Sequence, residues 1–174
     1  MPDHGDRPLL EALAAQARLG ILGLEPAEAL AHSRRYDAVL APGSRVIDLG
    51  SGGGIPGLVV AFDRPDLTVT LLDARQKRTD QLHRLVRRLG LQDRVRVVCD
   101  RVEHFGAVEA GAFDCLVARR FGPPAQVLAA AGALVGPRDG LLAVSAAPDD
   151  RWDVTPGWVR VDDAPASLVV LRRP

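Results

Sequence analysis

Short apolar runs recur along the middle of the chain and alternate with segments of helical periodicity. The runs read RVIDLG (45–50), TVTLLD (68–73), RVRVVC (94–99) and FDCLVA (113–118), and they are rich in β-branched residues. Such runs are typical of parallel strands buried on both faces. Strands that alternate with helices require right-handed crossovers. The sequence therefore predicts an α/β fold with a doubly wound, mostly parallel sheet.

The segments around these runs read as helices. Leu82, Leu85, Val86 and Leu89 form one helical stripe in KRTDQLHRLVRRLGL (77–91), which Gly90 ends. A further helix is expected over 125–135, and it is followed by a strand over 140–147. Two short helices, over 8–19 and 26–40, each begin with a proline, a residue that suits the first helical turn.

The last stretch breaks the alternation. WVRVDD (158–163) and SLVVLRR (167–173) are separated by only three residues, too few for a helical crossover. We expect them to form an antiparallel hairpin at the sheet edge. Seven strands that end in such a hairpin are the layout of the Rossmann-like class I methyltransferase fold. We expect one domain over 1–174, with N-terminal helices over 1–43 and the Rossmann-like core over 44–174.

Composition bears on the location of the protein and on metal binding. No apolar run approaches the roughly 20 residues of a membrane span, and the polar, acidic N-terminus does not read as a signal peptide. Cys99 and Cys115 lie in apolar runs, so we expect buried, reduced thiols and a cytoplasmic protein. The sequence contains no CxxC or HExxH spacing, so we expect no metal site.

Charge is balanced but unevenly spread. The 22 Lys and Arg residues equal the 22 Asp and Glu residues, which argues against a general polyanion-binding protein. Arginines nevertheless concentrate between residues 75 and 101, and aspartates concentrate in the last third of the chain. This asymmetry permits a local basic face that binds RNA phosphates, with a solvated arginine-rich helix face as the alternative.

Five glycines lie in the stretch VIDLGSGGGIPGL (46–58), where the first strand should meet a helix. Gly50, Gly52 and Gly54 allow positive φ and a close approach of the backbone to a ligand. In doubly wound sheets the ligand lies beyond the carboxyl end of the first strand, where N–H groups of the next helix are free. A tight turn without a ligand is the alternative.

Two aspartates favour the ligand. Asp73 ends the second strand, where a carboxylate can accept hydrogen bonds from ribose hydroxyls. Asp48 lies inside the first strand, where a charge is costly unless it is hydrogen-bonded, and it can hold the glycine loop or, through water, a ligand ammonium group. NAD competes because Gly52, Gly54 and Gly57 also satisfy GxGxxG. The GxGxG run, the preceding acid and the terminal hairpin favour S-adenosylmethionine (SAM).

Four motifs together carry a family resemblance. DLGSGGGIPG, RPDLTVTLLDARQKR, DRVEHF and FDCLVARRF occur in this order between residues 44 and 145. They resemble the RsmG (GidB) family of SAM-dependent small-subunit rRNA guanine-N7 methyltransferases, in a shortened and divergent form. The resemblance implies that Gly50 and Ile55 line the SAM pocket, that Asp73 meets the ribose, that Val102 and Glu103 hold the adenine region, and that Arg119 reaches the ligand. With the loop residues Asp48, Ser51, Gly52 and Gly54, these form the predicted SAM site. It also gives Arg119 a role in the reaction.

The chain departs from the family in three places. Only about forty residues precede the first strand, whereas family members carry a longer helical region. His32 matches a family histidine, but Arg35 stands where an aspartate is usual. Ser145 and Ala146 replace a Lys-Gly pair after the fifth strand. SAM binding therefore carries over more safely than rRNA specificity.

Guanine N7 has a free lone pair, so its methylation needs no general base, and the sequence offers no convincing one. Candidate contacts to RNA are His32, Arg120, Lys77 and Arg78. A small-molecule O- or carboxyl methyltransferase, a non-catalytic SAM-binding relative and a dinucleotide-dependent redox enzyme remain the alternatives.

Overall fold

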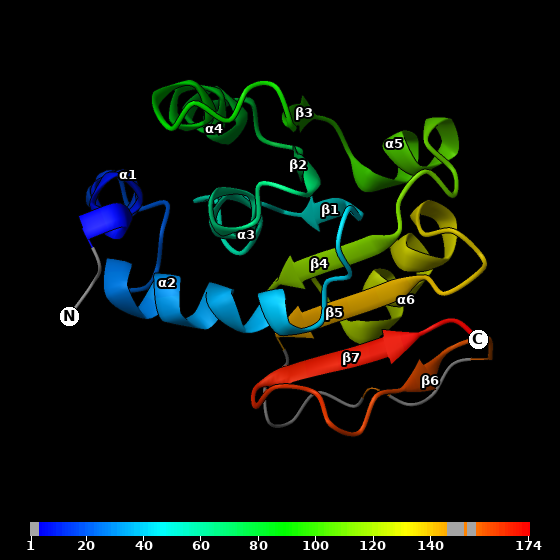
Figure 1. The fold of residues 1–174 in the computed structure, drawn as a ribbon. Helices are drawn as coiled ribbons and strands as arrows, with labels where there is room; N and C mark the ends of the chain where they lie inside the picture. Colours follow the sequence, from blue (N-terminus) through cyan, green and yellow to red (C-terminus); the bar gives the residue numbers. More distant parts are fainter. Residues whose placement is uncertain (1–3, 146–151, 153–155) are drawn as a thin grey trace.

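A seven-stranded sheet forms the centre of the computed structural model, which describes residues 4–145, 152 and 156–174 (Figure 1). The strand order is β3-β2-β1-β4-β5-β7-β6. The strands are β1 (Arg45–Leu49), β2 (Thr68–Asp73), β3 (Val95–Cys99), β4 (Cys115–Arg119), β5 (Leu141–Ser145), β6 (Val159–Arg160) and β7 (Leu168–Arg172). The first five are parallel, whereas β7 is antiparallel to both β5 and β6. The predicted fold class and terminal hairpin are confirmed.

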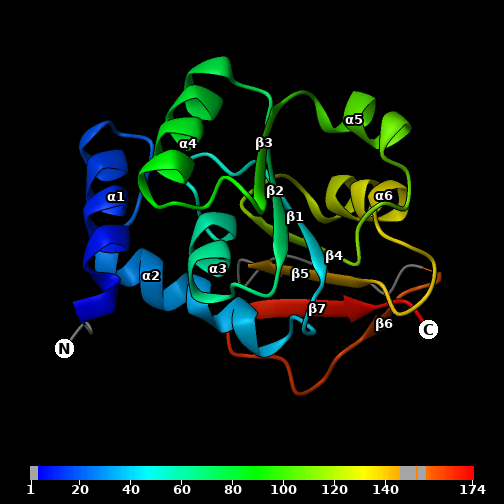
Figure 2. The same ribbon diagram turned by 45° about the horizontal axis from the view of Figure 1, so that its top comes forward.

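Helices cover both faces of the sheet, as Figures 1 and 2 show. Their bounds are α1 (Arg7–Arg18), α2 (Pro26–Arg34), α3 (Gly57–Asp63), α4 (Gln76–Arg88), α5 (Val102–Val108) and α6 (Pro124–Leu134), with short 3-10 helices η1 (His4–Asp6) and η2 (Arg35–Ala38). One core cluster joins one sheet face to α3 and α4, and a second joins the other face to α5 and α6. A third cluster joins α1 and α2 to α3.

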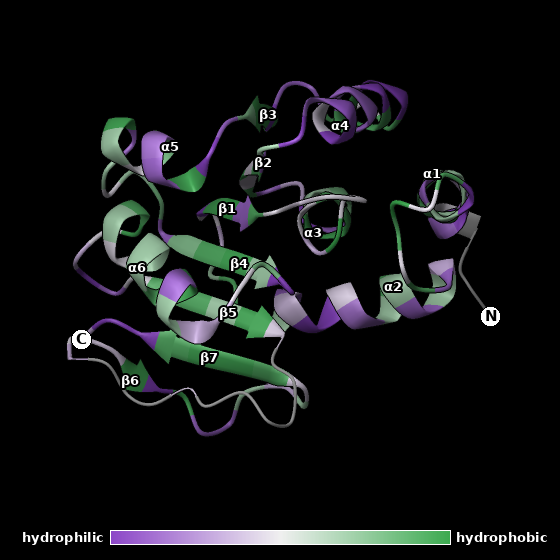
Figure 3. Ribbon diagram, turned by 180° about the vertical axis from the view of Figure 1, so that it is seen from behind, coloured by the Kyte–Doolittle hydropathy of each residue, from purple (hydrophilic) through white to green (hydrophobic). Residues whose placement is uncertain are grey.

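Hydropathy follows this layering. Figure 3 shows β4, β5 and β7 as continuously hydrophobic strands and α4 as a largely hydrophilic helix. The predicted stripe on α4 is confirmed in part: Leu82, Leu85 and Val86 are buried, whereas Leu89, just beyond the helix, is only partly buried. The central strands need no polar face because helices cover both sides of the sheet.

Several local predictions were wrong. The helix expected over 26–40 ends at Arg34 and continues as the 3-10 turn η2, and α5 has no counterpart among the predicted helices. The run that forms β3 is not buried on both faces, and Cys99 is exposed. The reason is that β3 is an edge strand of the sheet. Cys115, on the inner strand β4, is buried as expected.

Arg34 joins α2 to the neighbouring helices η1 and α3. Its guanidinium donates to Asp63 at the end of α3 through Nε (2.8 Å) and to Asp6 of η1 through Nη1 (2.9 Å). This proximity lowers the pKa of Asp6, chiefly through the hydrogen bond from Arg34. The two ion pairs hold α2 against η1 and α3, while His32 of α2 contacts Ser145 at the end of β5.

Candidate functional site

The register of the sheet aligns the ends of its parallel strands. Leu49 of β1 lies opposite Leu72 of β2 and Ala118 of β4, so Gly50, Asp73 and Arg119 follow at the same level. Arg119 in turn lies opposite Ser145 of β5. One row therefore runs along the carboxyl edge of the sheet, which is the edge where doubly wound folds bind ligands.

The glycine loop is held by the buried carboxylate of Asp48. Asp48 Oδ2 accepts a hydrogen bond from the Gly57 N–H at the start of α3 (3.0 Å). A Cβ at Gly57 would lie 2.6 Å from Asp48 and from the Leu71 side chain, so only glycine permits this approach of helix to strand. Gly50, Gly52 and Gly54 adopt the positive φ that glycine allows.

Asp48 is an unusual carboxylate. It is fully buried, and its Oδ1 has no hydrogen-bond partner among the described residues. Burial raises its pKa to about 7, and the hydrogen bond from Gly57 opposes that rise. A buried polar atom without a partner is a feature that calls for a ligand or water, and it lies directly beneath the glycine loop.

Asp73 fastens the loop from the second strand. Its Oδ2 accepts from the Gly52 N–H (3.0 Å) and its Oδ1 from the Arg75 N–H (2.9 Å). Arg78 Nη1 lies 3.5 Å from the same carboxylate. Asp73 therefore orders the glycine loop through Oδ2 and the backbone at Arg75 through Oδ1.

A small cavity of about 160 Å³ adjoins Gly50 and Asp73. Leu72, Val102 and Phe121 give it apolar walls, and Glu103 contributes a carboxylate at its rim. The Phe121 ring packs so closely over Gly50 that a Cβ there would lie 2.8 Å from Phe121 Cδ2. The walls of the cavity thus include the carboxylates of Asp73 and Glu103, the ring of Phe121 and the bare backbone of Gly50.

A larger cavity of about 460 Å³ lies on the other side of Phe121, beyond the ends of β4 and β5. This volume falls in the range of about 300–1,000 Å³ that small-molecule sites occupy. It is lined by side chains from the segment around α2 and η2, from the ends of β4 and β5, from α6 and from the C-terminal region: Leu24, Glu28, His32, Arg35, Arg119, Arg120, Phe121, Val127, Ser145, Trp152 and Ser167. Phe121 lines both cavities and divides them.

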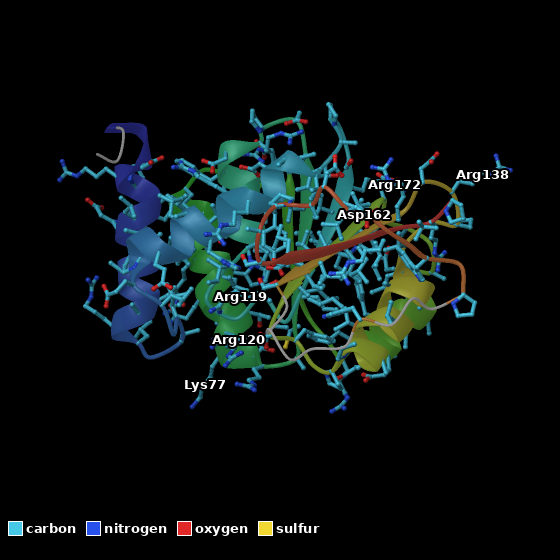
Figure 4. The ribbon with its side chains drawn as sticks, turned by 90° about the horizontal axis from the view of Figure 1, so that it is seen from below. Lys77, Arg119, Arg120, Arg138, Asp162 and Arg172 are labelled. Atoms are coloured by element: carbon cyan, nitrogen blue, oxygen red, sulfur yellow. The ribbon has the colours of Figure 1, made fainter. Side chains whose placement is uncertain are left out.

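The larger cavity is basic. Arg119 and Arg120 form no ion pair among the described residues, and burial is the main cause that lowers the pKa of Arg119, followed by the charge of Arg120. Arg120 adopts a φ of 53°, a backbone conformation that non-glycine residues rarely hold and that clusters at functional sites. Figure 4 shows Arg119, Arg120 and Lys77 at one end of the sheet, opposite Arg138 and Arg172.

The predicted basic helix is α4, and its cations differ in their surroundings. Arg88 is paired with Glu11 of α1 (2.8 Å), and Arg78 lies beside Asp73. Lys77, Arg84 and Arg87 form no ion pair within the part of the chain that the structure describes. Lys77 and Arg78 line a separate hollow with Leu19 and Ile21 and do not reach the larger cavity.

The structure separates the other candidate residues from the sequence by their surroundings. Gly50, Asp73, Val102 and Glu103 line the small cavity, and His32, Arg119 and Arg120 line the large one. Asp48, Ser51, Gly52 and Gly54 are buried in the loop beneath them. Ile55 packs instead against the N-terminal helices, in the cluster that contains Leu9 and Leu13.

Sequence reasoning missed Phe121 and Tyr36. Phe121 follows the two arginines of the ARRF motif, so its place after a strand end was a usable signal. Tyr36 lies four residues after His32, the spacing that puts two side chains on one helical face, and its hydroxyl contacts Ser145 at 2.7 Å.

Two absences hold for residues 4–145, 152 and 156–174. No group of three or more His, Cys, Asp or Glu side chains is placed to hold a metal ion there. None of the helices in these residues has the length and apolar character to span a membrane.

Comparisons with known proteins agree with this geometry. The family model GidB, rRNA small subunit methyltransferase G, matches residues 27–154. The ribosomal RNA small subunit methyltransferase G of Chromobacterium violaceum is 48% identical over 82 residues, which are 47% of this chain and 38% of that protein. The chain thus matches well under half the length of this relative.

Solved structures share the fold. A methyltransferase from Geobacter sulfurreducens superimposes with a TM-score of 0.66 at 19% identity, over 99% of this chain and 90% of its own. Coclaurine N-methyltransferase, solved with S-adenosylhomocysteine (SAH) bound, gives a TM-score of 0.56 at 22% identity over 69% of this chain and 36% of its own.

Proposed function

The chain belongs to the GidB family, rRNA small subunit methyltransferase G, and on this premise we propose that it transfers a methyl group from SAM to a nitrogen of small-subunit rRNA. Guanine N7 is the atom that the resemblance implies. If rRNA is the substrate, the protein acts in the cytoplasm.

The observation that carries the proposal is the pair of cavities divided by Phe121 at the carboxyl edge of the sheet. The small cavity offers what an adenosine needs: the Asp73 carboxylate as an acceptor for ribose hydroxyls, and the apolar walls of Leu72 and Val102 for a base. The large cavity has the volume and positive charge for a nucleotide. Because the two cavities adjoin at Phe121, a donor held in one would lie next to an acceptor held in the other, and such proximity favours the transfer.

The residues present fit SAM. The loop of Gly50, Gly52 and Gly54 leaves backbone free of side chains, and the unpartnered Oδ1 of Asp48 lies beneath it. When bound, SAM supplies a methyl group made electrophilic by its sulfonium. The chain's own part is to hold SAM and acceptor in register and to keep water out, and no proton has to leave guanine N7.

Asp73→Ala is expected to weaken SAH binding by about 1–3 kcal/mol, the range for charged hydrogen-bond partners left unmade. Asp73 is 4% exposed and also holds the Gly52 N–H, so the loop loses an anchor as well. Isothermal titration calorimetry with SAH measures the loss. Asp80→Ala, at an exposed position on α4, is the control. An NADH affinity above that for SAM in the wild type would favour the redox alternative instead.

Arg119→Ala is expected to lower methyl transfer about 10- to 100-fold, because a half-buried cation facing the acceptor is lost. SAH affinity should change little, since Arg119 lines the larger cavity and not the smaller one. Arg138→Ala, at the opposite end of the sheet in Figure 4, should leave both quantities unchanged. Equal losses of methyl transfer in Arg119→Ala and Arg138→Ala would show that Arg119 has no specific role in the site.

The function itself is tested by incorporation of labelled methyl groups from SAM into protein-free small-subunit rRNA and into assembled small subunits. Binding of the RNA should weaken steeply with salt, because each neutralised phosphate releases a condensed counterion. If no label enters the free rRNA or the assembled subunits although SAH binds clearly, the small-molecule methyltransferase or the non-catalytic relative would be favoured.

A further inference from the structure

The hydroxyl of Ser145 lies between two side chains of the N-terminal region. Its Oγ is 2.7 Å from His32 Nε2 and 2.7 Å from Tyr36 Oη. Tyr36 Oη is also 2.9 Å from the carbonyl oxygen of Ala118, on β4. Tyr36 is fully buried, and burial raises the pKa of its hydroxyl, so the phenol keeps its proton at neutral pH.

These contacts allow only one set of hydrogen-bond directions. A carbonyl oxygen can only accept, so Tyr36 donates its single proton to Ala118. Tyr36 Oη must then accept from Ser145, since otherwise two lone pairs would face each other at 2.7 Å. Ser145 has no second proton, so its oxygen accepts from His32, which carries its hydrogen on Nε2.

Neutral His32 therefore has an unprotonated Nδ1. Partial burial is the main cause that lowers the pKa of His32, and the charges of Arg119, Arg35 and Arg120 lower it further against an opposing effect of Glu28. Nδ1 has no hydrogen-bond partner among residues 4–145, 152 and 156–174, and the ring lines the larger cavity.

We infer that His32 Nδ1 accepts a hydrogen bond from an N–H or O–H group of the methyl acceptor, and that Ser145 and Tyr36 hold the imidazole in the tautomer that can do so. This inference rests on the proposed function, because it takes the larger cavity as the acceptor site. It adds a requirement on the acceptor: the group must present a donor on the side facing α2.

A guanine meets this requirement on its Watson–Crick edge, which carries N–H donors, while its N7 edge carries only acceptors. Enzymes that modify an extruded base commonly read that Watson–Crick edge. His32 then orients the base and takes no proton from N7. The methyl group moves from sulfur to N7, and the hydrogen shared with His32 stays on the base.

The tautomer is tested first, without any acceptor. Protein labelled with ¹⁵N at histidine is measured by NMR at pH 7.5, about one unit above the ordinary histidine pKa of roughly 6.5. The two ring-nitrogen signals of His32 should show the proton on Nε2 and none on Nδ1. Ser145→Ala removes the acceptor for Nε2–H, so signals of the Nδ1–H tautomer should appear. A wild-type His32 protonated on Nδ1 would overturn the inference, whatever the protein methylates.

The contact to the acceptor is tested by methyl transfer to small-subunit rRNA. His32→Leu should lower kcat/KM about 5- to 100-fold, because a donor of the acceptor loses its partner. His32→Gln should retain most of the activity, because its amide can donate to Ser145 and still offer an oxygen. His83→Leu, at an exposed histidine of α4, is the matched control.

The pH profile separates this contact from a structural role. Wild-type kcat/KM relative to that of His32→Gln should fall as pH decreases through the lowered pKa of His32, because a protonated Nδ1 can no longer accept. A pH-independent ratio, or full activity of His32→Leu, would overturn the inference while leaving the proposed function intact. A wild type that methylates no RNA, with the predicted tautomer present, would overturn the proposed function, and with it the acceptor contact.

Discussion

Gly52→Val is expected to reduce SAH affinity at least about 100-fold, a loss of roughly 2.7 kcal/mol. Gly52 has a φ of 48°, which a β-branched residue holds only at a cost of about 1–3 kcal/mol. Its Cβ would also lie 3.3 Å from Arg78 Nη1 and 3.5 Å from the Gly50 carbonyl oxygen. The loop would have to leave the position in which Asp73 accepts from the Gly52 N–H.

Gly111→Val is the matched control for backbone strain. Gly111 has a similar φ of 64°, and no atom lies within 4 Å of the Cβ it would gain. We expect a lower melting temperature in this variant with unchanged SAH affinity in calorimetry. An affinity for SAH retained in Gly52→Val would show that this loop does not hold the cofactor.

Asp48→Asn is expected to remove a pH dependence of stability worth about 3 kcal/mol between pH 5 and 8. Burial raises the folded-state pKa of Asp48 from an ordinary 3.8 to about 7. Between these two values the unfolded chain loses this proton while the folded protein keeps it. The free energy of unfolding therefore falls as pH rises, and the fall ends above the folded-state pKa.

Urea unfolding of wild type and Asp48→Asn across this pH range measures the effect. Asparagine can still accept from the Gly57 N–H, so the variant should gain stability relative to the wild type as pH rises. The other titrating groups contribute equally to both proteins and cancel in the difference. Asp80→Asn, an exposed carboxylate of α4, should give a curve parallel to that of the wild type. Parallel curves for Asp48→Asn would mean that Asp48 is ionised in the folded protein throughout.

Local chemistry was sufficient to predict the frame of this protein from its sequence. Apolar β-branched runs predicted four of the parallel strands, because a strand covered on both faces needs no polar side, and the apolar run after the last helix predicted the fifth. The three residues between the last two runs predicted the hairpin, because a crossover needs more chain. Gly50, Gly52 and Gly54 allow positive φ, and the loop adopts it at all three. The division of the chain at residue 43 stays a prediction.

The edge position of β3 could not be predicted in the same way. The sequence of β3 is as apolar as that of an inner strand, and only the strand order decides that Cys99 faces solvent. The sequence likewise could not show which cations of α4 are paired, since Arg88 forms an ion pair with Glu11 of another helix.

The contacts that assemble the larger cavity were decided by the tertiary structure. His32 and Ser145 are 113 residues apart in sequence, and no periodicity relates them. Arg34 joins α2 to Asp6 and Asp63, and this brings His32 and Tyr36 to the ends of β4 and β5. Short-range patterns determined the strands and the glycine loop because these depend on neighbouring residues. The hydrogen-bond directions around Ser145 depend on contacts between distant segments, which only the folded chain makes.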